Sequence, residues 1–183
     1  MKRMVLLALG ALTISTVAIA QPPNDDAIER ALAAAPRQLK DGATVIKWKA
    51  DNTYDTLKKG TNRLVCYDRS GEPGRAPFAV QCTSIANLDR VAQSRKFEAI
   101  TDKDARKAAI DAAEKDGTRV KPEFGSVWLT MNGPDREHAR IHTTVAVPGA
   151  TSQSMGLPDN PKQNGIWIMD AGTTTAHLMI PGS

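Results

Sequence analysis

The spacing of apolar residues along the chain alternates between a helical and a strand-like pattern. A first helix is predicted over 24–35, where apolar residues recur every three or four positions and Pro36 follows the last of them. β-Branched and aromatic residues then gather in 43–49, which predicts a strand. Two shorter strands are predicted at 63–67 and 78–82, joined by a turn rich in glycine and proline.

Helical spacing returns in the middle of the chain. Residues 84–97 carry apolar side chains at helical intervals, and 102–116 carries a stripe of alanines that ends before Gly117. An alanine stripe lets a helix approach its neighbour closely but buries little area. We therefore expect the second helix to pack by one edge and to be solvated elsewhere.

Strict alternation of apolar and polar residues dominates the last third. Strands are predicted at 126–131 and 140–147. Two further strands, 166–169 and 175–180, flank 170–174, whose composition is typical of a hairpin loop.

A segment without periodicity, 148–165, separates these two pairs of strands and is rich in Gly, Pro, Ser and Asn. A loop this long inside a compact domain is either a functional flap or a misassigned element. Met155 and Asn160 are its candidate flexible residues. One expectation is that a small molecule or partner binds beneath this loop.

The order of elements is helix, strands, two helices, strands. This order lacks the regular strand–helix alternation of a parallel doubly wound fold. We predict the α+β class: a small single domain with a mainly antiparallel sheet and two or three helices packed on one side.

The first twenty residues have the form of a secretory signal peptide. Lys2 and Arg3 form a positive head, 4–20 carries no charge, and the small-residue exit Ala18-Ile19-Ala20 precedes a polar turn. An uncleaved membrane anchor is the alternative, because the apolar run lies at the lower limit of what spans a bilayer. Cleavage predicts a periplasmic or secreted protein with no stable membrane span.

Cleavage would leave residues 21–183, which suit one globular domain. Losing Lys2 and Arg3 lowers the basic count from 24 to 22 against 20 acidic residues, a net charge of +2. Basic and acidic residues are interspersed through the middle third, and aromatic residues are few. This pattern predicts a solvated helical surface with ion pairs and argues against nucleic-acid binding.

Cys66 and Cys82 are the two cysteines, and both lie in the exported part. In an oxidising compartment an even pair most often forms a disulfide, and the Gly/Pro-rich chain between them is able to turn back. The alternative is a reactive or metal-binding thiol. That reading needs a free cysteine next to a base.

Three histidines are the candidates for metal or acid–base chemistry. His138 and His142 would share a helix face, but the strand-like pattern from Arg140 onward separates them by about 13 Å at 3.3 Å per residue. His142 and His177 would meet on a sheet surface if their strands are adjacent, with Asp170 or Glu137 completing a metal site or an acid–base pair. Solvent-facing histidines are the alternative.

Other catalytic signatures are absent from the sequence. It contains no Gly-x-Ser-x-Gly elbow, no Ser-x-x-Lys pair and no phosphate-binding glycine loop followed by Lys. No haem attachment motif occurs, and no cofactor is expected. The tryptophans Trp48, Trp128 and Trp167 fall in predicted strands, where a core or sheet-face position is the expectation and a ligand contact the alternative.

Five segments carry a resemblance to a group of small exported bacterial proteins with a signal peptide and one cysteine pair: Asp41–Val45, Cys66–Gly71, Pro77–Cys82, Val145–Thr151 and Ala176–Ile180. The resemblance implies a bacterial envelope protein. It implies no activity, so no catalytic residue is carried over.

Three functional hypotheses follow. The first is a non-enzymatic exported domain that binds a small molecule or an envelope protein. The second is a metal-dependent or acid–base enzyme that uses His142 and His177. The third is a structural or interaction protein of the envelope, which predicts an exposed apolar patch or a stable oligomer.

Overall fold

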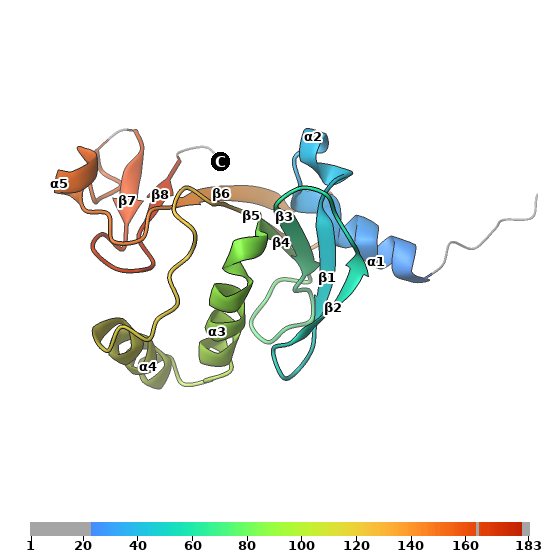
Figure 1. The fold of residues 1–183 in the computed structure, drawn as a ribbon, viewed down its shortest axis with the longest axis horizontal. Helices are drawn as coiled ribbons and strands as arrows, with labels where there is room; N and C mark the ends of the chain where they lie inside the picture. The colour runs from blue at the N-terminus through green and yellow to red at the C-terminus, as the bar shows by residue number, and fades with distance from the viewer. Residues whose placement is uncertain (1–22, 164, 181–183) are drawn as a thin grey trace, which may run out of the picture.

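The computed structural model describes residues 23–163 and 165–180 (Figure 1). The predicted signal peptide, residues 1–20, lies outside them. No helix in the described part of the chain is long and apolar enough to cross a membrane. The helices are α1 (Pro23–Ala31), α2 (Arg37–Lys40), α3 (Leu88–Glu98), α4 (Lys103–Lys115) and α5 (Ser152–Met155), with short 3-10 turns η1 (Leu32–Ala34) and η2 (Ile85–Asn87).

Eight strands form one mixed sheet in the order β2-β1-β3-β4-β5-β6-β8-β7. Only β1 and β3 pair in parallel among the described strands, so the sheet is mainly antiparallel. The strands are β1 (Thr44–Trp48), β2 (Tyr54–Lys58), β3 (Leu64–Asp68), β4 (Phe78–Ser84), β5 (Val127–Gly133), β6 (Arg140–Ala146), β7 (Trp167–Met169) and β8 (His177–Met179). The α+β class and the mainly antiparallel sheet are confirmed.

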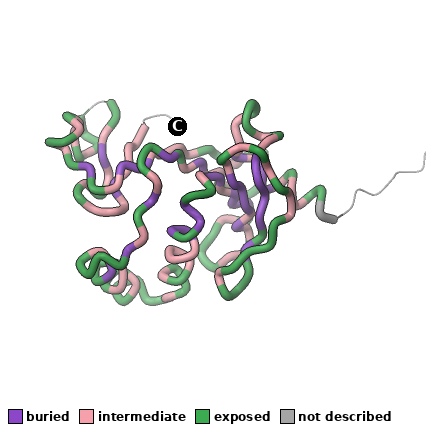
Figure 2. Tube along the Cα trace, viewed as in Figure 1, coloured by how far each residue is buried: buried purple, intermediate pink, exposed green. Residues whose placement is uncertain are grey.

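Helices cover both faces of this sheet, where the sequence pattern suggested one. Alternation along β3 turns Cys66 toward α1 and η1, and turns Val65 and Tyr67 toward α3. The first face packs on Ala31 and Leu32, and the second on Leu88 and Val91, so each helix has its own apolar cluster. Figure 2 shows the buried residues concentrated along the central strands and on part of α3.

Three elements are not predicted by the sequence pattern. The short helix α2 follows Pro36, β2 pairs with β1 at the edge of the sheet, and α5 occupies part of the segment 148–165. Thr151 caps α5 by accepting a hydrogen bond from the Ser154 amide, and Ser154 Oγ accepts one from the Thr151 amide. Met155 packs against a third apolar cluster that includes Ile168, so it anchors this segment.

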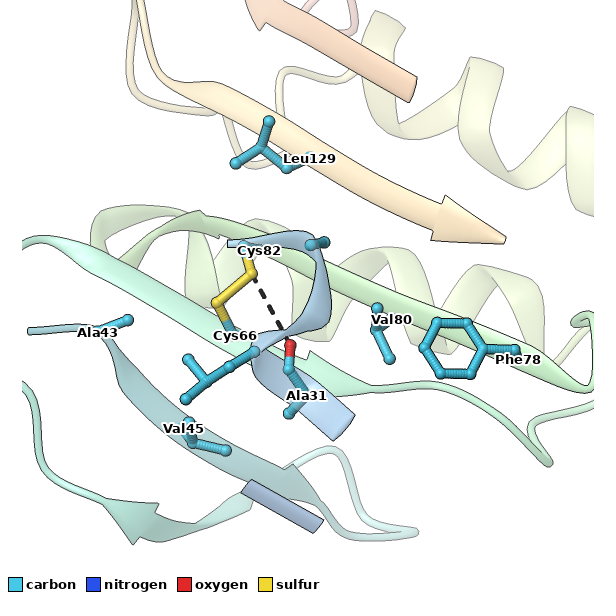
Figure 3. Packing of buried hydrophobic residues seen from close by; sticks show 10 residues of the cluster. Ala31, Ala43, Val45, Cys66, Phe78, Val80, Cys82 and Leu129 are labelled. Atoms are coloured by element: carbon cyan, nitrogen blue, oxygen red, sulfur yellow. Dashed lines mark hydrogen bonds between the residues drawn. A yellow bond between two sulfur atoms is a disulfide. The ribbon is translucent and has the colours of Figure 1, made fainter. Parts of the chain in front are cut away.

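The two cysteines form a disulfide, as predicted. Cys66 and Cys82 lie directly opposite each other in the β3–β4 pair, with 4.1 Å between their Cα atoms. Both residues are fully buried beneath α1 and η1, and Cys82 Sγ lies 3.9 Å from the carbonyl oxygen of Ala31 (Figure 3). No free cysteine remains among the described residues.

Candidate anion-binding pocket

A pocket of about 200 Å³ lies between α3, the connection from α4 to β5, and the sheet where β5, β6 and β8 run side by side. Figure 1 shows this connection running from α4 alongside α3 toward the sheet. Ten residues from these elements line the pocket: Arg90, Ser94, Arg119, Pro122, Trp128, Thr144, Ala146, Thr175, Ala176 and His177. The lining thus contains two arginines and no carboxylate.

Arg90 extends from α3 and is only 5% exposed. Its Nη1 donates hydrogen bonds to the carbonyl oxygen of Val120 at 2.6 Å and to Thr174 Oγ1 at 2.8 Å. Its Nη2 donates to Thr175 Oγ1 at 2.6 Å. Arg90 therefore connects α3 to the α4–β5 connection and to the turn before β8.

Arg119 approaches the pocket from the α4–β5 connection and is 7% exposed. Its two terminal nitrogens donate to Gln93 Oε1 and Ser94 Oγ, at 2.8 and 3.0 Å, and its guanidinium lies 4.9 Å from the centre of the Phe97 ring. The Nε–H of Arg119 is buried without an acceptor in the described part of the protein. A buried donor without a partner carries a desolvation cost.

The two guanidinium groups are buried near each other with like charge. Burial and, to a smaller extent, the like charge of Arg119 lower the pKa of Arg90 to about 10, although the charge of Glu114 acts in the opposite direction. Burial also lowers the pKa of Arg119. Neither arginine forms an ion pair with a carboxylate among the described residues. Both stay protonated at neutral pH, so the pocket is cationic.

Glu114 supplies a compensating negative charge, and one threonine hydroxyl separates its carboxylate from the guanidinium of Arg90. Its carboxylate accepts from the amide of Thr174 at 3.1 Å and from the hydroxyls of Thr174 and Thr175. Burial alone would raise the pKa of Glu114, but these hydrogen bonds and the two arginines hold it below its ordinary value. The hydroxyl of Thr174 thus lies between Arg90 and Glu114.

His177 contributes an imidazole ring to the same pocket. Its Nδ1 lies 2.8 Å from the carbonyl oxygen of Thr175. Because a carbonyl oxygen only accepts, Nδ1 carries the proton of that bond, which leaves Nε2 as the ring nitrogen for a ligand.

The structure does not bring His142 and His177 together. Their strands are adjacent and the two residues share a sheet face, but His177 lies opposite Ala146, four residues from His142 along β6. That offset is about 13 Å at 3.3 Å per residue. His138 bonds instead to the exposed carboxylate of Asp135.

Asp170 follows β7 in the tight turn toward β8, with a positive φ of 54°. Its backbone carbonyl accepts the hydroxyl of Thr173 at 2.8 Å. No group of three or more His, Cys, Asp or Glu residues in 23–163 and 165–180 is arranged to hold a metal ion.

The segment 148–165 does not cover the pocket, since none of its described residues lines it. Met155 lies in α5, and the side chain of Asn160 accepts the amide of Lys162 at 3.2 Å.

Sequence reasoning missed both arginines and placed Arg119 on a solvated, ion-paired surface. A solvated surface is correct for α4, since most of its side chains are exposed or half-buried, but not for Arg119 in the connection after it. One signal was available: Arg119 follows the helix stop at Gly117 and precedes Val120 and Pro122, outside the charged helix.

A second hollow, of about 430 Å³, is mainly apolar and lies at the same end of β5 but on the opposite face of the sheet, on the side of Leu129. Leu39, Phe124 and Val127 line it and are 41%, 65% and 38% exposed. This is the type of exposed apolar surface that the interaction-protein hypothesis predicts.

Comparisons with protein-family models, with curated proteins and with solved structures find no match to this chain.

Proposed function

We propose that the protein is an exported, non-enzymatic module that binds a small anionic molecule in the pocket formed by Arg90, Arg119 and His177. One observation carries the proposal: two buried arginines line one pocket, and no carboxylate in the described structure pairs with either of them.

The energetics of buried charge support this proposal. Moving a guanidinium out of water costs several kcal/mol unless an opposite charge and hydrogen bonds compensate it. Five hydrogen bonds connect Arg90 and Arg119 to neutral oxygens. The carboxylate of Glu114 compensates their charge only through the hydroxyls of Thr174 and Thr175. An anion in the pocket would place an opposite charge directly beside both guanidinium groups.

A purely structural role is the competing interpretation, because Arg90 ties three segments together. Isothermal titration calorimetry with phosphate, sulfate, acetate and benzoate distinguishes the two. We expect at least one anion to bind at 1:1 stoichiometry, and Arg119→Gln to weaken its binding at least tenfold.

The exposed Arg37 on α2 provides a control of equal charge change. Arg37→Gln should leave the affinity unchanged, whereas a general electrostatic effect would weaken binding in both variants. If none of the four anions binds, or if Arg119→Gln binds as tightly as the wild type, the anion-binding function is excluded.

Export is part of the same proposal, and the buried disulfide supports it, since such bonds persist in oxidising compartments. Mass spectrometry of the protein from the periplasmic fraction or the medium should give an N-terminus at Gln21. An intact chain beginning at Met1 in the cytoplasm would contradict export.

Two measurements address the alternatives. Elemental analysis of the purified protein would favour the metal-dependent enzyme if it found a stoichiometric ion that is lost in a His142→Ala, His177→Ala variant. Light scattering that showed a stable oligomer, dispersed by Phe124→Ser, would favour the interaction protein.

A further inference from the structure

The side chains of the pocket separate into a cationic end and an apolar wall. Arg90, Arg119 and the hydroxyl of Ser94 form the first, from α3 and the connection after α4. The wall consists of uncharged side chains from this connection and from the sheet, namely Pro122, Trp128, Ala146 and Ala176. A hydrated inorganic ion would contact only the cationic end and would leave the apolar wall without a partner.

Trp128 is the largest component of the wall, and its position follows from the alternation of β5. Its neighbour Leu129 points into the cluster beneath α1, so Trp128 points to the opposite face, toward α3. There it packs against Leu88 and Val91 on one side but remains half-exposed where it lines the pocket.

The size of the pocket limits what it can hold. At about 200 Å³ it is smaller than the roughly 300–1,000 Å³ typical of sites for drug-sized ligands. It nevertheless exceeds by far the 10–15 Å³ or so that a single water needs. A compact organic molecule with one ring matches this volume better than a bare ion or a nucleotide.

We propose that the ligand is a small aromatic oxyacid, with its acid group at Arg90 and Arg119 and its ring against Trp128. This inference rests on the proposed anion-binding function. A guanidinium pairs with the oxygens of a carboxylate or a phosphonate through parallel hydrogen bonds, and an indole ring gains from stacked or edge-on contact with another ring. Trp128 is the residue that selects for the ring.

Matched pairs of probes test this inference with the full-length mature protein. Benzoate and acetate share a carboxylate, and phenylphosphonate and methylphosphonate share a phosphonate, so each pair differs mainly by the ring. In at least one pair we expect the aromatic member to bind at least tenfold more tightly. The pair that shows this preference identifies the acid group.

Variants at Trp128 test whether this side chain causes the tighter binding of the aromatic probes. Trp128→Leu keeps an apolar side chain next to α3, and should remove most of the preference for the aromatic member of each pair. Trp128→Phe should retain part of it. Trp167 lies on the edge strand β7 and does not line the pocket, so Trp167→Phe is the matched control and should leave the affinity for every probe unchanged.

Nuclear magnetic resonance of the indole N–H groups gives an independent readout. Benzoate or phenylphosphonate should shift the Trp128 signal more than the signals of Trp48 and Trp167. Binding of small and aromatic anions with equal affinity, or an unchanged preference in Trp128→Leu, would overturn this inference while leaving anion binding intact. If the wild type binds none of the four probes in a way that depends on Arg119, both the aromatic preference and the anion-binding function are excluded.

Discussion

Thr174 shows how one side chain couples two charges at the scale of single residues. Its hydroxyl accepts a hydrogen bond from Arg90 and donates one to Glu114, while its amide also donates to Glu114. A hydroxyl suits this position because it both donates and accepts. The hydroxyl of Thr175 makes the same pair of contacts, with a longer bond to Glu114, so the two threonines together connect the two charged groups.

We predict that Thr174→Val lowers the free energy of unfolding by about 1–3 kcal/mol, because an isosteric methyl removes one hydrogen bond from Arg90 and one from Glu114, and both of these groups are partly buried. Urea unfolding followed by circular dichroism measures the change. Thr56→Val on the exposed edge strand β2 is the control and should have a much smaller effect. Equal stability of the wild type and Thr174→Val would contradict the bridging role.

The candidate site could not be predicted from residue types alone. The hydroxyl partners of Arg90 lie 84 and 85 residues further along the chain, so no local pattern shows that its guanidinium is buried. His177 was recognised as a functional candidate, but its partner was sought in His142. Alternation along β6 and β8 predicts correctly that the two histidines share a face of the sheet. It does not predict the register between the strands, which places His177 opposite Ala146 and not opposite His142.

At the scale of elements, an ion network fastens the β3–β4 connection to the end of α3. Arg69, which is buried, bonds to Glu72 and Glu98, and Glu98 also bonds to Arg75 at 2.6 Å. Arg95 bonds to Glu72 from the helix. The network holds the residues that the disulfide encloses against the helical layer.

This network should make stability depend on pH. Burial on its own would raise the pKa of Glu98, but hydrogen bonds from Arg75 and the charge of Arg69 hold it below its ordinary value. The stabilisation is thus complete well above the ordinary glutamate pKa of about 4.3, and is lost as the pH falls through the lower folded-state value.

We predict that wild-type stability falls more steeply between about pH 5 and pH 3 than that of Glu98→Gln, which lacks this titrating group. Thermal unfolding across that interval measures both slopes. Glu137→Gln, at an exposed position, should retain the wild-type slope. A Glu98→Gln profile parallel to the wild type would show that this carboxylate does not contribute.

Most elements were predicted because their apolar patterns are regular, and the exceptions have physical reasons. β2 (Tyr54–Lys58) is an edge strand whose residues are exposed or half-buried, so it lacks the alternation of a buried strand. The parallel pairing of β1 with β3 brings together strands separated by β2, which no local pattern specifies. α5 is a single capped turn, too short to produce a period.

At the scale of the whole molecule, the disulfide joins the two central strands on which both faces of the fold are built. β3 and β4 also pair through their backbones, and β4 continues to β5, so the sheet has other contacts across this point. The bond should therefore stabilise a fold that the remaining sheet contacts already define.

We predict that Cys66→Ala, Cys82→Ala lowers the free energy of unfolding by about 2–4 kcal/mol and that the double variant still folds. Chemical denaturation measures the loss. The denatured wild type should show no thiol reactive toward Ellman's reagent before reduction. Two reactive thiols, or a double variant as stable as the wild type, would contradict this account.

The burial of the sulfur atoms beneath α1 and η1 has a consequence for the sequence of assembly. An oxidant or a thiol reaches Cys66 and Cys82 only while the segment 23–35 is undocked, since both cysteines are inaccessible once it packs. Reduction of the native protein by dithiothreitol should then follow the same opening equilibrium as hydrogen exchange in α1. α1 precedes both cysteines in the chain and is synthesised before them, yet it would dock on the sheet only after the disulfide has formed.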